Sequence, residues 1–275
     1  MGIKSLASKV AKLSAVPSAG RPGPTLERLS ADPAWPMRAM GLDPDLWQAR
    51  YLADPFPRQL LLASRRVGKS TVAGVRTLSH CLTTDGALAL VLSPTLRQSQ
   101  EFARTVVDAD RAIGRPVPVV RDSATGIEWA NGSRMLSLPD NQRGVVGFSP
   151  TMIVIDEASR VSDALYKSLR PMLGLGAELC LLSTPFGRLG FFWEIWDDPN
   201  RLNLFRWWKV TADHCPRLSP EFLAEERIEL GNRWFQQEYY CNFTEAIGAV
   251  FTQAMIEAAF VSGIEPLFPI EDPPS

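Results

Sequence analysis

Long apolar runs, paired cysteines and an excess of positive charge are all missing from this sequence. No uninterrupted apolar run approaches the ~18 residues of a membrane-spanning helix, which excludes an integral membrane protein. The four cysteines of the 275-residue chain form no Cys-x-x-Cys pair and no secretory signal precedes them, so we expect reduced thiols in a cytosol. With a net charge of −1 the chain has no global positive field, and any contact with nucleic acid must use a local patch.

The composition is that of a globular protein with an ample core, because 45% of the residues are apolar and 21% are charged. The first 31 residues contain five basic residues and one acid, Glu27, and the run VPSAGRPGP within them breaks any helix. We interpret residues 1–31 as a flexible basic arm rather than a transit peptide. Residues 32–245 are expected to form the main domain, and residues 246–275 a C-terminal tail.

Short apolar runs alternate with amphipathic segments along the main domain, which predicts crossover connections and a mainly parallel sheet. Between them, residues 116–139 alternate short β-rich runs with turn signals, and Asn131-Gly132 predicts a hairpin. Strands are expected within residues 58–64, 87–95, 151–159, 177–185 and 203–211, and helices within 42–55, 70–82, 96–114, 161–173 and 219–240, the last as one or two helices.

The stretch LLLASRRVGKSTVAG, residues 60–74, has the order strand, loop ending in Gly-Lys-Ser, helix. That geometry suits a triphosphate, because backbone N–H groups and the helix N-terminus face the phosphates while Lys69 neutralises their charge. The hydroxyl of Ser70 is placed to bind Mg²⁺. Ala63 stands where a phosphate-binding loop usually has its first glycine, and Arg65 and Arg66 replace the usual small residues. An ordinary strand–turn–helix is the alternative on this stretch alone.

In the stretch MIVIDEAS, two adjacent acids, Asp156 and Glu157, follow four apolar residues of an expected buried strand. Asp156 is expected to hold the Mg²⁺ ion or its water, and Glu157 to polarise the attacking water. Two adjacent acids after a buried strand are costly unless a cation or a proton-transfer role uses them, and the alternative is a solvated loop that carries two acids. A further apolar run ends in Ser183 and Thr184, and the parallel sheet would bring both hydroxyls to the edge that carries the phosphate loop.

The series LWQ, SRRVGKST, LSPT, NGSRMLSLPDNQRGVVG, MIVIDEAS and LLSTPFGRLGFF resembles the ATPase domain of the large terminase subunit, the DNA-packaging motor of tailed bacteriophages. The resemblance runs from about residue 42 to residue 243. In that family the phosphate loop typically lacks its first glycine, so Ala63 looks like a family trait. The resemblance implies an α/β P-loop NTPase fold of the RecA/ASCE type, a three-layer sandwich with a mainly parallel central sheet and an inserted β-hairpin region.

The same resemblance implies roles for individual residues. Arg65 matches an arginine proposed to act on the γ-phosphate within one subunit, and Arg143 matches one proposed to reach the ATP of a neighbouring subunit. Either would stabilise transition-state charge, an effect of roughly 10³–10⁵ in rate for such arginines. Gln48, with Trp47 beside it, matches the motif that reads adenine, although helix packing is an equal alternative for Trp47. Ser183 and Thr184 match the motif that couples hydrolysis to movement, and the ATP-binding loop comprises Ser64, Arg65, Val67, Gly68, Lys69, Ser70 and Thr71.

The resemblance also implies partners and cofactors: ATP and Mg²⁺, double-stranded DNA, a portal protein, a small terminase subunit and a homo-oligomeric ring, in the cytoplasm of a bacterial host and transiently docked on the procapsid. Large terminases continue into a nuclease domain, for which this chain has no room after residue 246. Nuclease activity is therefore not expected here, and a separately encoded nuclease is a candidate partner. Two alternatives stay open: the first motor domain of a superfamily 2 helicase-like ATPase, and a non-hydrolysing nucleotide-binding prophage remnant.

Overall fold

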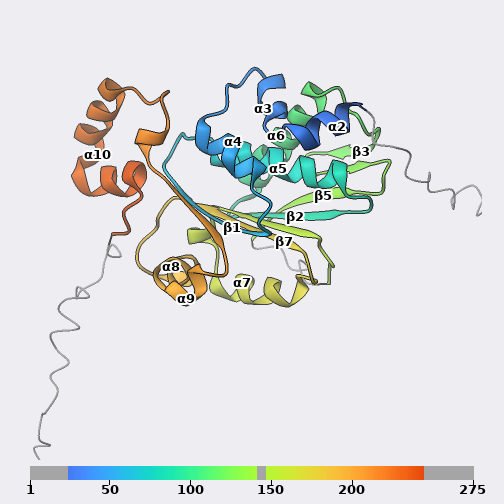
Figure 1. Ribbon diagram of the computed structural model, residues 1–275. Helices are drawn as coiled ribbons and strands as arrows, with labels where there is room; N and C mark the ends of the chain where they lie inside the picture. Colours follow the sequence, from blue (N-terminus) through green and yellow to red (C-terminus); the bar gives the residue numbers. More distant parts are fainter. Residues whose placement is uncertain (1–23, 141–146, 245–275) are drawn as a thin grey trace, which may run out of the picture.

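The computed structural model describes residues 24–140 and 147–244, and within them the centre of the molecule is an eight-stranded sheet in the order β3-β4-β5-β2-β6-β7-β1-β8 (Figure 1). Neighbouring strands run parallel except at the pairs β3–β4 and β4–β5, which are antiparallel. The bounds are β1 Arg58–Ala63, β2 Leu88–Ser93, β3 Val119–Ser123, β4 Gly126–Trp129, β5 Arg134–Pro139, β6 Met152–Asp156, β7 Glu178–Ser183 and β8 Arg206–Val210.

Helices cover both faces of this sheet, so the molecule has three layers (Figure 1). One face carries α2 (Pro24–Ala31), α3 (Trp35–Ala39), α4 (Leu46–Ala53), α5 (Lys69–Thr83) and α6 (Leu96–Ala112), while the other carries α7 (Asp163–Leu169), α8 (Gly190–Asp197) and α9 (Pro199–Leu202). The helix α10 (Pro220–Tyr240) lies to one side of the sandwich. Short 3₁₀ turns occur at Ala158–Arg160 (η1), Arg170–Met172 (η2) and Ala212–His214 (η3). The predicted fold class, a mainly parallel three-layer α/β sandwich, is confirmed.

The central strands are apolar on both faces because each face is covered by helices. Successive side chains of a strand point to opposite faces. In β1, Leu61 and Ala63 therefore join the core beneath α5 and α6, whereas Leu60 and Leu62 join the core beneath α7 and α8. This alternation explains why continuous apolar runs, rather than alternating ones, mark the parallel strands in the sequence.

The predicted hairpin signal marks a real turn. Asn131 and Gly132 connect the antiparallel strands β4 and β5, and Gly132 has φ +79°, a left-handed conformation that glycine adopts at little cost. Gly231 likewise interrupts α10 with φ 70° and ψ 159°, so the segment predicted as one or two helices is two helical pieces that meet at a glycine.

The described part of the expected N-terminal arm is helical. Residues 24–31 form α2, and Leu29 is buried in the core against α5, because the apolar side of this short helix finds a partner in the sandwich. Residues 1–23 and the expected tail 246–275 lie outside the described residues. In the described part of the chain, no helix combines the length and apolarity that crossing a membrane requires.

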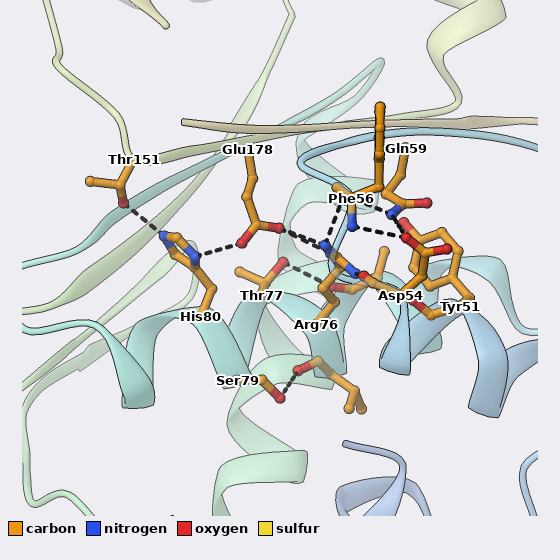
Figure 2. Close-up of polar contacts among 12 residues, drawn as sticks. Tyr51, Asp54, Phe56, Gln59, Arg76, Thr77, Ser79, His80, Thr151 and Glu178 are labelled. Carbon is orange, nitrogen blue, oxygen red and sulfur yellow. Dashed lines mark hydrogen bonds and ion pairs between the residues drawn. The ribbon is translucent and has the colours of Figure 1, made fainter. Parts of the chain in front are cut away.

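Charged side chains tie the elements together at the edge where the parallel strands begin (Figure 2). Arg76 of α5 donates to the carboxylate of Glu178 at 2.8 Å and to the carbonyl oxygen of Asp54 at 2.9 Å. His80, one turn later, lies 3.1 Å from the other oxygen of Glu178 and 2.8 Å from the hydroxyl of Thr151. Because these groups satisfy one another, we interpret the cluster as an anchor of α5, far from the edge that carries the phosphate loop.

Candidate nucleotide-binding site

The loop between β1 and α5 has the shape of a phosphate-binding loop. Gly68 precedes the first residue of α5, Lys69, and its φ of 87° lies in the left-handed region. A Cβ atom on Gly68 would lie 2.8 Å from Nε2 of Gln48, so this amide, which bonds to the carbonyl oxygen of Val67, would have to shift. The 15-residue helix α5 therefore presents its N-terminal N–H groups at the end of a buried strand, where an anion binds favourably. Around this turn, Ser64 and Val67 are buried, and Thr71 is half-buried in the first turn of α5.

Two side chains of α5 face the two acids at the end of β6. Nζ of Lys69 lies 2.9 Å from Oε1 of Glu157, and the hydroxyl of Ser70 donates to Oδ2 of Asp156 at 2.8 Å. Lys69, Asp156 and Glu157 therefore lie at one edge of the sheet, and their roles toward a nucleotide stay predictions. The parallel order of the strands brings these residues together, since β6 lies next to β7, which pairs with β1.

The two acids sit in different electrostatic surroundings. Burial and, less strongly, the neighbouring charge of Glu157 raise the pKa of Asp156 to about 6, against the opposing effect of Lys69. Burial also opposes ionisation of Glu157, but the positive charges of Lys69, Arg160 and Arg65 outweigh it and lower its pKa. Glu157 is thus held as a carboxylate, the form that can accept a proton from water.

Ser70 and Asp156 fit a magnesium ion. Their oxygen atoms face each other at 2.8 Å at the edge of the phosphate loop, and Mg²⁺ prefers one or two such ligands together with waters and substrate phosphates. In residues 24–140 and 147–244 no three His, Cys, Asp or Glu side chains gather closely enough to hold a metal by themselves.

The residues after β7 meet the turn after β6. The hydroxyl of Ser183 lies 2.6 Å from that of Ser159, which also donates to the carbonyl oxygen of Thr184 at 2.8 Å. The hydroxyl of Thr184 lies 3.4 Å from Oε2 of Glu157. Ser183 and Thr184 therefore lie at the same edge as the phosphate loop, as predicted, and contact the segment that carries the catalytic candidate.

Arg160 is a member of this cluster that the sequence interpretation missed. Its Nη1 donates to Oε2 of Glu157 at 2.9 Å and to the hydroxyl of Thr184 at 3.1 Å. The sequence signal was the spacing: Arg160 follows Glu157 by three residues, and a 3₁₀ turn places such residues on one side. An arginine three residues after the acidic pair could therefore have been included.

Arg65 turns toward α10. Its Nε pairs with Oε2 of Glu238, and its backbone N–H donates to the carbonyl oxygen of Glu238 at 2.9 Å. The guanidinium of Arg66 lies 5.1 Å from the ring centre of Phe222, so this arginine contacts α10 as well. A pocket of about 660 Å³ separates the loop from α10, and its lining consists of Arg65, Arg66, Lys69, Glu226, Glu229, Leu230, Trp234, Glu238 and Tyr239.

Gln48 and Trp47 do not line this pocket. The side chain of Gln48 is 1% exposed; its Nε2 donates to the carbonyl oxygen of Val67 at 3.0 Å and its Oε1 accepts from the backbone N–H of Asp45 at 2.9 Å. Trp47 packs in the core, as the packing alternative for this residue anticipated. The side chain of Gln48 therefore supports the phosphate loop, and contact of either residue with adenine stays a prediction. Arg143 lies outside the described residues.

Comparisons with known proteins agree with this geometry. The family model described as "Terminase large subunit, T4likevirus-type, N-terminal" matches residues 60–258. The ATPase domain of the large terminase from Thermus phage P74-26 is similar with a TM-score of 0.64 and 19% identity, over 76% of this chain and 97% of that one. No curated protein sequence matches the chain.

Longer terminases are similar over part of their length. The large terminase of a thermophilic bacteriophage, solved in complex with ADP, has a TM-score of 0.61 and 14% identity over 76% of this chain and 53% of that one. The large terminase of bacteriophage HK97 has a TM-score of 0.59 and 14% identity over 73% of this chain and 50% of that one. This chain thus spans about half the length of these two proteins. At such identities the structural likeness establishes the fold.

Proposed function

The chain belongs to the terminase large-subunit family, and we propose that it hydrolyses ATP to drive double-stranded viral DNA into a procapsid. The observation that carries this proposal is the meeting of Lys69 with Glu157 and of Ser70 with Asp156 at one edge of the sheet. A phosphate-binding loop without an adjacent carboxylate could bind a nucleotide, but the pair adds a candidate base for hydrolysis. The ADP complex of a terminase with the same fold supports nucleotide binding.

Binding of the triphosphate would use the loop and the start of α5. The N–H groups of the first turn and the amine of Lys69 face the place where phosphates would lie, and both favour negative charge. Bound Mg²⁺ would neutralise phosphate charge, held by Ser70 and Asp156. The pocket between the loop and α10 is large enough, at about 660 Å³, to accommodate the rest of a nucleotide.

Glu157 would orient and polarise the attacking water. Lys69 pairs with Oε1 of this carboxylate in the structure, and the phosphates of ATP would compete for the same amine because they carry more negative charge. Their arrival would free Oε1 to accept a proton from water. Arg65 is proposed to leave Glu238 and stabilise charge on the γ-phosphate, and Arg143 to do so from a neighbouring subunit.

A motor of this kind would grip DNA phosphates without reading base sequence. The proposed partners are double-stranded DNA, the portal protein, a small terminase subunit and further copies of this chain in a ring. Since the net charge is −1, local lysines and arginines must make the DNA contacts, and DNA binding should weaken steeply with added salt.

Purified protein provides the central test, with ATP, Mg²⁺, double-stranded DNA and portal protein. We expect DNA-stimulated hydrolysis that Glu157→Gln reduces by about 10²–10⁴-fold while ATP binding persists, because the amide cannot accept the proton. Glu194→Gln is the matched control: Glu194 is an exposed glutamate of α8 that pairs with Arg201 of α9. Absence of hydrolysis by the wild-type protein under these conditions would refute the motor and leave the non-hydrolysing alternative.

Two further measurements separate the remaining possibilities. The family match favours a terminase over a superfamily 2 helicase, and unwinding of a forked duplex would reverse that preference. To test whether Arg143 acts on the ATP of a neighbouring subunit, the Arg143→Ala and Glu157→Gln proteins are mixed at varying ratios and ATP hydrolysis is measured. Activity that departs from the sum of the two proteins is expected, and strictly additive activity would remove the case for Arg143 in a neighbour's site.

A further inference from the structure

The side chain of Arg160 joins three groups at the end of the sheet. Its Nη1 contacts Oε2 of Glu157 at 2.9 Å and the hydroxyl of Thr184 at 3.1 Å, and its guanidinium carbon lies 4.7 Å from the ring centre of Phe186. The three partners come from two segments, the turn after β6 and the segment after β7. Arg160 thus bridges the catalytic candidate and an aromatic residue that is 42% exposed at the surface.

A tight backbone turn connects Glu157 to Arg160. Glu157 adopts a left-handed conformation, with φ 52°, and the 3₁₀ turn η1 follows it directly. The backbone N–H of Arg160 donates to the carbonyl oxygen of Glu157 at 2.9 Å, which closes the turn. Both ends of the ion pair are therefore fixed on one tight loop, and the planar guanidinium has little freedom to point elsewhere.

The two oxygens of Glu157 have different fates once a nucleotide binds. Oε1 contacts Lys69, and the phosphates of a bound nucleotide would attract this amine away from the carboxylate. Oε2 contacts Arg160 and Thr184, for which no phosphate contact is proposed. After Lys69 leaves, the contacts of Oε2 are those that remain to hold the carboxylate in place. A general base must keep its orientation to act on water, since a displacement of about 1 Å can cost ~100-fold in rate.

We propose that Arg160 is a positioning residue for Glu157 and that Phe186 holds Arg160 in place, so that the surface segment after β7 acts on the catalytic carboxylate through this arginine. The inference rests on the proposed hydrolysis and deepens it. It assigns a physical link between the hydrolytic site and a surface side chain. A partner that moves Phe186 would change the position of Glu157 without touching the nucleotide.

The test is a double-mutant cycle on ATP hydrolysis. We expect Arg160→Met to lower kcat by roughly 10- to 100-fold while KM and nucleotide affinity change less than about twofold. Arg160→Lys should recover part of the loss, because it restores the charge but not the planar fork. Phe186→Ala should lower kcat by a smaller factor, and the double variant Arg160→Met/Phe186→Ala should be no slower than Arg160→Met alone, since both changes act through one contact.

Two controls separate this role from general damage. Leu189→Ala changes another exposed apolar residue of the same segment, and Arg188→Met removes a nearby arginine that stacks on Trp193 instead; both should keep the wild-type kcat. If Arg160→Met hydrolyses ATP at the wild-type rate, or loses affinity in proportion to rate, the positioning role is refuted. If the Arg160 and Phe186 effects multiply, the link to Phe186 is refuted. An inactive wild-type protein would refute the proposed function itself, and this inference with it.

Discussion

Arg65 and Glu238 are 173 residues apart in the chain, yet their side chains form an ion pair and their backbones a hydrogen bond of 2.9 Å. The pair fastens the phosphate loop to α10 across the mouth of the pocket. The arginine is more than half exposed, whereas the glutamate is 6% exposed. In this structure the arginine expected to act on the γ-phosphate is therefore held by another partner.

This pairing predicts that Glu238 competes with ATP for Arg65. We expect Glu238→Gln to lower the KM for ATP severalfold, because the freed guanidinium can meet phosphate charge, while the backbone contact remains. Glu229→Gln is the control, since it removes one negative charge from the same pocket without releasing Arg65. Steady-state hydrolysis over a range of ATP concentrations measures the effect. An equal shift in both variants would show that only the charge of the pocket matters.

The turn at Gly68 predicts that adding one methyl group, in Gly68→Ala, lowers the affinity for ATP. Gly68→Ala places a Cβ 2.8 Å from Nε2 of Gln48 and forces alanine to φ +87°, so we expect at least a tenfold loss of ATP affinity. Gly86→Ala is the matched control, because Gly86 has φ +67° but nothing within 4 Å of its would-be Cβ. Binding of a fluorescent nucleotide reports both. Equal affinities for the two variants would contradict the steric argument.

Ser70 is predicted to set the magnesium requirement. Ser70→Ala removes the hydroxyl that faces Asp156 at 2.8 Å, so we expect the Mg²⁺ concentration for half-maximal hydrolysis to rise by about 10- to 100-fold. Ser70→Thr, which keeps a hydroxyl, should need little more Mg²⁺ than the wild type. The hydroxyl of Ser79, on the same helix, donates to the carbonyl oxygen of Val75, so Ser79→Ala should leave the magnesium requirement unchanged. An unaltered magnesium titration of Ser70→Ala would contradict its assignment as a ligand.

Asp110 predicts how stability depends on pH. It is fully buried on α6, and burial raises its pKa from the ordinary 3.8 to about 6. The folded state therefore holds this proton more tightly than the unfolded chain between about pH 4 and 6, and Asp110 makes stability fall as pH rises through that window. We expect Asp110→Asn to gain on the order of 1–3 kcal/mol relative to the wild type between pH 4.5 and 7.

Urea unfolding of the wild type and the Asp110→Asn variant at both pH values measures this difference. Asp108→Asn, an exposed change on the same helix, is the control and should show no such dependence. A difference in unfolding free energy between the wild type and Asp110→Asn that stays constant with pH would show that Asp110 is ionised in the folded state throughout the range.

Several features of this protein were determined by the sequence alone. The continuous apolar runs predicted buried parallel strands, and the Asn131-Gly132 pair predicted the turn between β4 and β5. The approach of Lys69 to Glu157 and of Ser70 to Asp156 followed as well, because the carboxyl ends of parallel strands share one edge of a sheet. These features depend on local periodicity and on the order of the elements, which a sequence displays directly.

The tertiary structure decided which partner each polar side chain takes. Arg65 lies against Glu238, Arg160 bridges Glu157 and Thr184, and the amide of Gln48 is used by the phosphate loop itself. Tertiary packing also placed Leu29 in the core, although the sequence around this residue predicts a basic arm. Such contacts depend on the packing of segments far apart in the chain. The interaction free energies of competing polar partners differ enough to decide the pairing only when burial removes water from the polar groups.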